Sequence, residues 1–220
     1  MKRLMALVLA TVVLSMTGVA AAEEKTMLFK SFAYGSSQDE INKLIKVSKC
    51  GKTMKGNTVL CADNYMFFKK KWKILFVFED DRLNNVRLDG RLKQSEIITL
   101  VRDVSETFVL IGAQGGNGFF DYINTVFTQG VDKATVMLSN FEVVARSVGP
   151  VTYSFVDKGS FESLIEKHRS AQDIMINAAP TLRELDIIIN GDGSVEINFF
   201  APGMTLKEAV KDKPALQEKF

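Results

Sequence analysis

The sequence predicts an α+β fold in which helices pack on antiparallel sheet, and two observations lead to this class. First, apolar and polar residues alternate with a period of two in neighbouring segments, which predicts strands of a meander at Thr58–Cys61, Tyr65–Lys70, Trp72–Glu79 and Asn85–Leu88. Second, the turn Asn190–Gly193 separates two apolar runs, Leu185–Ile189 and Val195–Phe199, and this is the strongest hairpin signal in the chain. Strands that are grouped and joined by turns favour α+β over a doubly wound sheet.

The N-terminal part of the fold is predicted to begin with a short strand at Thr26–Phe32, and a helix follows. Ser37 is followed three residues later by Glu40, which is the pattern of a capping box. Apolar residues at helical spacing extend this helix over Gln38–Ser48, and Gly51 follows as a residue that can end it. The meander comes next, with a tight turn at Asp80–Arg82.

The middle of the chain is predicted as helices followed by strands. Ser95 is placed to cap a long helix with an apolar stripe that reaches Leu110, and the glycine-rich segment Gly112–Gly118 predicts a flexible connection to a second helix at Phe119–Phe127. The content of Val, Thr and Phe favours strands at 135–138, 141–148 and 151–156, the first of which is ambiguous between strand and helix. Ser160 is predicted to cap a helix that reaches about Ala178, and a short charged helix is expected at Thr205–Lys213.

Residues 1–22 have the pattern of a cleavable secretory signal peptide. Lys2 and Arg3 precede an apolar run, and small residues at 19–22 supply the cleavage pattern before Glu23. The alternative is an uncleaved anchor, because residues 4–22 are just long enough to cross a bilayer. Cleavage predicts a periplasmic or secreted chain without transmembrane anchoring. It consists of a helix plus antiparallel meander at 23–90 and an α+β C-terminal part at 91–220, in one domain or two.

The charge balance argues against nucleic acid as a partner. Without Lys2 and Arg3, 26 basic residues balance 26 acidic residues. A net charge near zero gives no general attraction to polyanions or anionic lipid.

The two cysteines, Cys50 and Cys61, are predicted to form a structural disulfide. In an exported chain an even pair at this short separation usually pairs, and the segment between them is polar and rich in turn residues. The alternative, a reactive thiol pair, is disfavoured because redox motifs usually place two residues between their cysteines.

The chain lacks the residue patterns of common catalytic, metal and cofactor sites. Its single histidine, His168, cannot complete a histidine-rich metal site, and paired cysteines are not available as nucleophiles or zinc ligands. The segment Gly112–Gly118 matches neither phosphate-binding glycine motif. We therefore predict no catalytic residue, no metal and no cofactor.

One local cluster combines cations with an aromatic residue and forms the candidate binding surface: Lys69, Lys70, Lys71, Trp72 and Lys73. Such clusters bind acidic partners or phosphates. In a meander the same pattern also arises from a buried aromatic face and a solvated lysine face, and lysines on edge strands discourage aggregation.

Two segments resemble a known family. Residues 34–41, with a Gly-x-Ser helix start at Gly35, and residues 72–86, with an aromatic strand and the run Leu75–Val86, are similar to outer-membrane assembly lipoproteins of the SmpA/OmlA type and to β-lactamase-inhibitor-protein-like domains. The resemblance covers residues 30–88 and implies helices on a small antiparallel sheet that binds proteins. Two departures are the missing lipobox cysteine and Asp81 at the position of the usual turn glycine.

These observations predict a non-enzymatic, exported module that binds another envelope protein or peptide through its sheet face or a strand edge. The alternative is a periplasmic protein that binds a lipid or small apolar ligand in a pocket between the aromatic-rich sheet and the helices.

Overall fold

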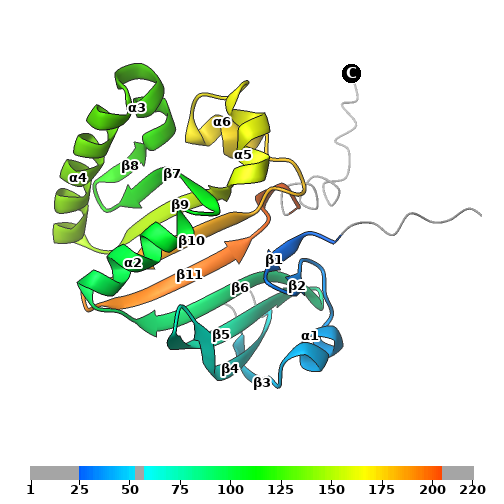
Figure 1. The fold of residues 1–220 in the computed structure, drawn as a ribbon. Coiled ribbons are helices and arrows are strands. Elements are labelled where there is room, and N and C mark those ends of the chain that lie inside the picture. The colour runs from blue at the N-terminus through cyan, green and yellow to red at the C-terminus, as the bar shows by residue number, and fades with distance from the viewer. Residues whose placement is uncertain (1–24, 53–56, 205–220) are drawn as a thin grey trace, which may run out of the picture.

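A computed structural model describes residues 25–52 and 57–204 (Figure 1). The predicted signal peptide and the predicted helix Thr205–Lys213 lie outside these residues. The N-terminal elements are β1 (Met27–Phe29), β2 (Phe32–Ala33), α1 (Gln38–Leu44), β3 (Ser48–Lys52), β4 (Thr58–Phe67), β5 (Lys70–Glu79) and β6 (Arg82–Arg91). They are followed by α2 (Gln94–Val104), β7 (Phe108–Gly115), β8 (Gly118–Asp121), α3 (Tyr122–Gln129), α4 (Val131–Val148), β9 (Val151–Asp157), α5 (Lys158–Ile165), α6 (Ala171–Ile176), β10 (Glu184–Ile189) and β11 (Ser194–Phe200).

A nine-stranded sheet organises the described residues and confirms the predicted α+β class. Its strand order is β3-β4-β5-β6-β11-β10-β9-β7-β8, and every pairing is antiparallel. The predicted meander has three strands rather than four, β4, β5 and β6, because the predicted strands Thr58–Cys61 and Tyr65–Lys70 are largely one strand, β4. The predicted C-terminal hairpin forms β10 and β11. Because β6 pairs directly with β11, the sheet runs without interruption from the N-terminal meander into the C-terminal part (Figure 1).

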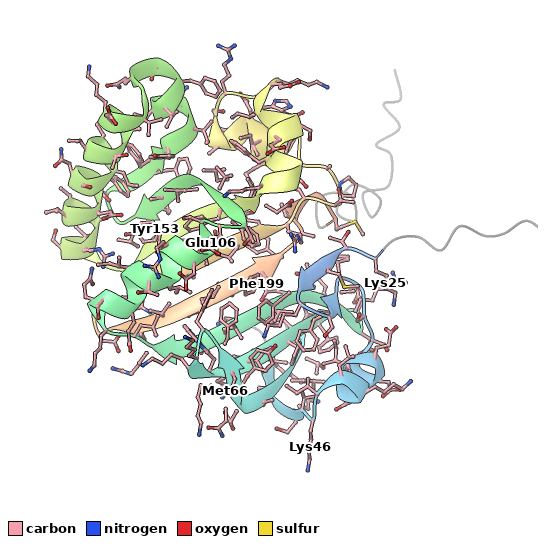
Figure 2. All side chains as sticks on the ribbon, in the orientation of Figure 1. Lys25, Lys46, Met66, Glu106, Tyr153 and Phe199 are labelled. Atoms are coloured by element: carbon pink, nitrogen blue, oxygen red, sulfur yellow. A yellow bond between two sulfur atoms is a disulfide. The ribbon has the colours of Figure 1, made fainter. Side chains whose placement is uncertain are left out.

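One face of the sheet, here called the inner face, carries the main core. The alternating residues Trp72, Ile74, Phe76 and Phe78 of β5 are all buried, as the period-two pattern predicts. Helix α2 crosses this face in front of β9, β10 and β11, and the small β1–β2 sheet lies over it near β6 (Figure 1). Phe199 of β11 belongs to this core (Figure 2). Its ring stacks on that of Phe29 of β1, with centroids 4.4 Å apart.

Close packing around Trp72 explains a glycine in the neighbouring strand. A Cβ atom at Gly90 of β6 would lie 2.6 Å from the Trp72 ring, so only glycine admits the indole at this point. The indole Nε1–H donates a 2.9 Å hydrogen bond to the Phe67 carbonyl oxygen, which satisfies its polar group.

Helix α1 begins as predicted. The Ser37 hydroxyl accepts a hydrogen bond from the Glu40 N–H at 3.2 Å, and the Glu40 carboxylate accepts one from the Ser37 N–H at 2.7 Å. This capping box satisfies donors that a helix start otherwise leaves free. The helix ends at Leu44, earlier than predicted, and β3 starts at Ser48.

The middle of the chain differs from the prediction. The strands predicted at 135–138 and 141–148 are wrong, because both segments belong to the 18-residue helix α4. Ala134 and Ala145 are buried on that helix, and Leu138 and Phe141 pack against the main core. This i, i+4, i+7, i+11 stripe gives the helix a packing face that outweighs the weak β-propensity of Val and Thr.

The predicted glycine-rich connection is also wrong, since Gly112–Gly118 contributes to the hairpin of β7 and β8. A Cβ atom at Gly112 would lie 2.5 Å from the Phe119 ring, and one at Gly115 would lie 2.5 Å from the Ala145 side chain. These glycines allow close packing between strand and neighbours rather than flexibility.

The helix predicted from Ser160 to about Ala178 is two helices, α5 and α6. Asp157, not Ser160, caps α5, and its carboxylate accepts hydrogen bonds from the N–H groups of Ser160 at 3.0 Å and Arg183 at 3.0 Å. Ser170 caps α6 through the Asp173 N–H at 3.0 Å.

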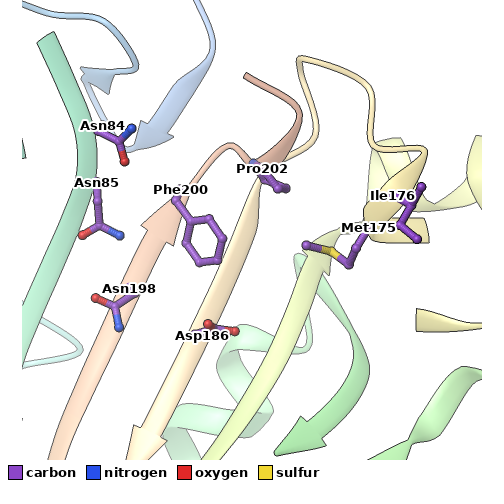
Figure 3. A pocket seen from close by; sticks show the side chains of 8 residues that line it. All are labelled: Asn84, Asn85, Met175, Ile176, Asp186, Asn198, Phe200 and Pro202. Atoms are coloured by element: carbon purple, nitrogen blue, oxygen red, sulfur yellow. The ribbon is translucent and has the colours of Figure 1, made fainter. Parts of the chain in front are cut away.

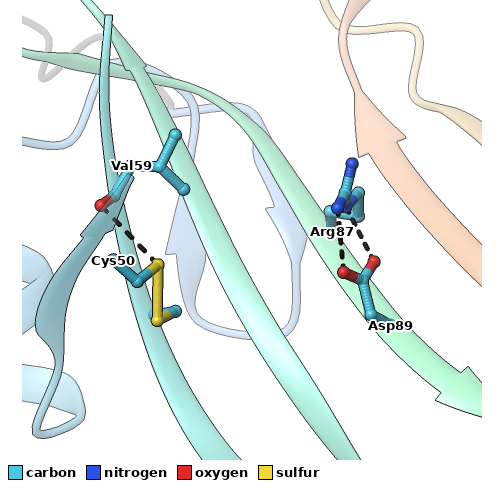
Figure 4. Close-up of a disulfide and its surroundings, with 5 residues drawn as sticks. Cys50, Val59, Arg87 and Asp89 are labelled. Atoms are coloured by element: carbon cyan, nitrogen blue, oxygen red, sulfur yellow. Dashed lines mark hydrogen bonds and ion pairs between the residues drawn. A yellow bond between two sulfur atoms is a disulfide. The ribbon is translucent and has the colours of Figure 1, made fainter. Parts of the chain in front are cut away.

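The predicted disulfide is confirmed. Cys50 of β3 and Cys61 of β4 are bonded, with their Cα atoms 5.9 Å apart, and the Cys50 Sγ lies 3.8 Å from the Val59 carbonyl oxygen (Figure 4). The bond fastens the edge strand β3 to the sheet. None of the helices in residues 25–52 and 57–204 has the length and apolar character that a bilayer crossing requires.

Candidate functional site

The opposite face of the sheet, here called the outer face, is mostly polar and half-buried on its four central strands. Its side chains alternate with those of the core and so point away from it. They are Lys71, Lys73, Leu75 and Val77 of β5, Asn85, Arg87 and Asp89 of β6, Glu196, Asn198 and Phe200 of β11, and Glu184, Asp186 and Ile188 of β10. Helices α5 and α6 pack on this side of the sheet at its β7–β9 end, where Val156 and Ile174 belong to a second, smaller core.

Strand register places the outer-face residues in rows of cross-strand neighbours, here called rungs. One rung contains Asn85, Phe200, Glu184 and Val156, contributed by β6, β11, β10 and β9. The next rung contains Arg87, Asn198, Asp186 and Ser154 from the same strands. Directly opposite residues share a face with Cβ atoms about 5 Å apart, so each rung is a row of neighbouring side chains.

A pocket of about 580 Å³ lies where these two rungs approach α6. Its sheet side is formed by Asn84, Asn85, Asp186, Asn198 and Phe200, and its other side by Met175, Ile176 and Pro202 (Figure 3). Figure 3 shows the side chains converging from β6, β11, β10 and α6. The pocket opens to solvent, its walls are largely apolar, and its polar groups lie on the sheet.

Asp186 is the acidic group that lines this pocket. Its Oδ1 accepts a 2.7 Å hydrogen bond from the Ser154 hydroxyl in the neighbouring strand. Burial raises the pKa of Asp186, and the hydrogen bond from Ser154 opposes that rise without cancelling it.

Glu184 lies two residues before Asp186, on the same face of β10, and is more deeply buried. Only 5% of the residue is exposed, and its Oε2 has no hydrogen-bond partner in the described part of the chain. Burial, and secondarily the neighbouring charge of Asp186, raises the pKa of Glu184 to about 9. At neutral pH this side chain is therefore a buried carboxylic acid beside Phe200, its cross-strand neighbour.

The cation in the same rung as Asp186 is already engaged by other carboxylates. Arg87 lies in the rung of Asp186, two strands away, and contacts both oxygens of Asp89 at 2.7 and 2.8 Å (Figure 4). Its Nη1 also lies 3.1 Å from Glu196 Oε2. Within residues 25–52 and 57–204 neither Glu184 nor Asp186 forms an ion pair. The adjacent Arg183 turns to the other side, where its guanidinium lies 5.5 Å from the Phe108 ring centroid.

The structure does not bring the five predicted binding residues to one surface. Trp72 is 2% exposed in the core, and Lys70 forms an ion pair with Glu96 of α2 that lowers the pKa of Glu96. Lys69 is in the turn between β4 and β5 with φ +58°, and with Lys70 and Trp72 it borders a smaller pocket of about 290 Å³ against α2. Lys71 and Lys73 are exposed on the outer face. Only these two of the five belong to the same sheet face as the larger pocket.

Sequence reasoning missed Glu184 and Asp186. The available signal was an alternation of two acids with buried apolar residues at the start of the strongly predicted strand Leu185–Ile189. An acid in such a pattern points to a face that is either solvated or functional. Among the described residues no group of three or more His, Cys, Asp and Glu side chains has the geometry of a metal site.

No protein-family model, curated protein sequence or solved structure matches this chain. The resemblance of residues 30–88 to SmpA/OmlA-type lipoproteins stays a prediction.

Proposed function

We propose that this chain is an exported, non-enzymatic module that holds a protein or peptide partner on its outer face. The observation that carries the proposal is a broad, half-buried sheet face with mixed polar and apolar side chains, next to an open pocket. An open pocket beside a flat sheet suits the side chains of a partner, whereas small-ligand sites usually enclose most of the ligand. The disulfide supports the export part of the proposal, because such bonds persist in oxidising compartments.

Charge is distributed unevenly over this face. Lys71 and Lys73 are on β5, whereas Glu184 and Asp186 are on β10 without a cation partner. A partner with an acidic end and a basic end would therefore bind in one orientation.

Site-specific photo-crosslinking in the native cell envelope tests the proposal. A benzophenone side chain placed at Leu75, on the outer face of β5, is expected to give a reproducible adduct with one protein. The matched control has the same group at Val143, which is 73% exposed on α4. Adducts at Val143 but not at Leu75 would move the interface to α4, and no adduct at either position would also contradict the proposal.

Charge reversal provides a second arm of the same test. Lys71→Glu combined with Lys73→Glu is expected to lower the adduct yield from Leu75, because both lysines share its face. Lys69→Glu changes the charge by two units in the turn instead, half the change of the double variant, and it should leave the yield unchanged.

A small organic ligand in the pocket is the second candidate function. The largely apolar walls formed by Met175, Ile176, Phe200 and Pro202 favour it. Native mass spectrometry separates the two: a retained molecule that adds a constant mass to the mature chain supports a ligand, and an unmodified mass supports the partner proposal.

A further inference from the structure

The chemistry of the pocket indicates which part of a partner it accepts, and this inference rests on the proposed function. We propose that the pocket receives a long aliphatic side chain ending in a cation, a lysine of the bound partner. The partner's ammonium group meets Asp186, beside which Glu184 lies on the same face, and its aliphatic stem lies against the apolar wall.

The acid next to the pocket, Glu184, has a carboxyl oxygen without a hydrogen-bond partner among the residues that the structure describes. Glu184 is 95% buried, given its 5% exposure, and its Oε2 lacks a hydrogen-bond donor in the described residues. Buried polar atoms are almost always paired, so the unpaired Oε2 is a polar atom that the described residues leave without a hydrogen bond. The side chain lies directly opposite Phe200 and shares its face with Asp186, and both of these residues line the pocket.

Within the described part of the chain, the acidic side of the pocket lacks a cation of its own. Arg87 is the cation that lies nearest in the rungs, and Asp89 and Glu196 already hold it. The side chains on the other side of the pocket, Met175 and Ile176 of α6 and Pro202 after β11, cannot be ionised. Asp186 therefore faces the pocket, with Glu184 beside it on the same face of β10, and neither pairs with a cation among the described residues. A cation supplied by the ligand would give Asp186 an oppositely charged partner.

The apolar wall next to Asp186 matches the shape and polarity of a lysine side chain. An ammonium group alone is strongly hydrated and gains little from an apolar wall. A lysine side chain combines that charge with four methylene groups, which pack on apolar surface while the head reaches a polar group. Phe200 and Met175 offer such a surface next to Asp186 (Figure 3).

This arrangement couples binding to a proton. Glu184 is protonated in the free protein at neutral pH, and a positive charge bound at the neighbouring Asp186 favours its ionised form, so binding of the ammonium group releases a proton to solvent. We therefore expect affinity for the cation to rise with pH between 6 and 8, by up to about tenfold per pH unit for one released proton.

The test uses n-pentylammonium, a mimic of the lysine side chain, and the neutral n-pentanol as its matched control. Both are titrated into the mature, disulfide-bonded protein at pH 6, 7 and 8 and followed by amide chemical shifts. We expect pentylammonium to shift signals of Asp186, Asn198 and Met175 with an affinity that rises with pH, and pentanol to bind more weakly without that dependence. Equal affinity for the two compounds, or no shift with pentylammonium, would overturn the proposal.

Three variants locate the effect. Glu184→Gln keeps the shape of the protonated acid, so the variant should fold while losing the pH dependence of pentylammonium binding. Asp186→Asn should bring pentylammonium affinity down to that of pentanol. Asp192→Asn removes an exposed acid at the other end of the β10–β11 hairpin, where it pairs with Arg91, and should change nothing. Unchanged binding in both pocket variants would contradict the proposal.

Crosslinking separates this inference from the proposed function. If the adduct at Leu75 forms but neither Glu184→Gln nor excess pentylammonium lowers its yield, the partner binds the outer face without placing a lysine in the pocket. If pentylammonium binds as expected but no adduct forms at Leu75, the pocket takes a free alkylamine and the partner proposal fails.

Discussion

Replacing Glu184 by glutamine should make the protein more stable at alkaline pH and leave it almost unchanged near pH 5. In the folded protein the pKa of Glu184 is raised to about 9, against 4.5 for the exposed carboxyl group. Between these two values the folded state holds a proton that the unfolded chain releases. A group whose folded pKa is raised stabilises the fold below the unfolded pKa, and the contribution is lost as pH rises towards the folded pKa.

The size of the effect follows from that single proton. The free energy of unfolding should fall by about 1.4 kcal/mol per pH unit from this group, or about 2.7 kcal/mol between pH 5.5 and 7.5. Glutamine does not ionise, so the free energy of unfolding of the variant lacks this dependence on pH. The difference in free energy of unfolding between variant and wild type should therefore grow by about 2.7 kcal/mol in favour of the variant from pH 5.5 to 7.5. Asp186, whose pKa is also raised, contributes in the same direction in both proteins and largely cancels from the comparison.

The assay is urea unfolding at fixed temperature from pH 5.5 to 7.5 with the disulfide intact. Fluorescence of Trp72, the single tryptophan and 2% exposed, reports the transition. Asp192→Asn serves as control, because the pKa of Asp192 is lowered and the group is ionised in both states throughout this range. If the difference between wild type and Glu184→Gln stays constant from pH 5.5 to 7.5, Glu184 is ionised in the folded protein and the reasoning on the pocket fails.

Three further predictions concern local structure. Lys69→Gly should raise the free energy of unfolding by about 0.5–1 kcal/mol in urea titrations, because φ is +58° there and glycine adopts this conformation without strain; a loss of stability would refute the turn geometry. Ser37→Ala should cost about 1 kcal/mol by removing a helix cap, and Ser37→Asp, which keeps an acceptor, should restore most of it in the same measurement. Replacing Cys50 and Cys61 together by alanine should lower the free energy of unfolding by about 3 kcal/mol, because the unfolded chain regains the conformational entropy that the disulfide removes. A change below about 1 kcal/mol by urea titration would contradict a stabilising role.

Local patterns predicted the parts of the fold in which neighbouring residues decide the outcome. The capping box at Ser37 and the turn at Asn190–Gly193 depend on residues close in sequence, and both structures form where expected. Asp81, which replaces the usual turn glycine of the resembling family, adopts φ +60°, and aspartate tolerates this region better than most residues.

The errors arose where distant contacts decide the outcome. Helix α4 is rich in valine, and its buried stripe is apparent only once β7 and β9 provide a surface for Ala145 to pack on. The glycines of β7 look flexible in the sequence, but Gly112 is required by the ring of Phe119 in the neighbouring strand. The acids Glu184 and Asp186 resemble ordinary strand residues until α6 forms one side of the pocket that Asp186 lines.

The pairing of β6 with β11 has a consequence for how the chain reaches this structure. Leu88 pairs with Ile197, and positions 88 and 197 are 109 residues apart, so the two parts of the sheet can join only after most of the chain has been made. The hairpins of β4, β5 and β6 close short loops and should gain protection early, whereas a contact over so long a separation forms slowly. Pulse-labelling hydrogen exchange should show amides of β5 protected before those of β11, and simultaneous protection would contradict this order. The outer face, which needs both halves of the sheet, would then become competent to bind only in the last step of folding.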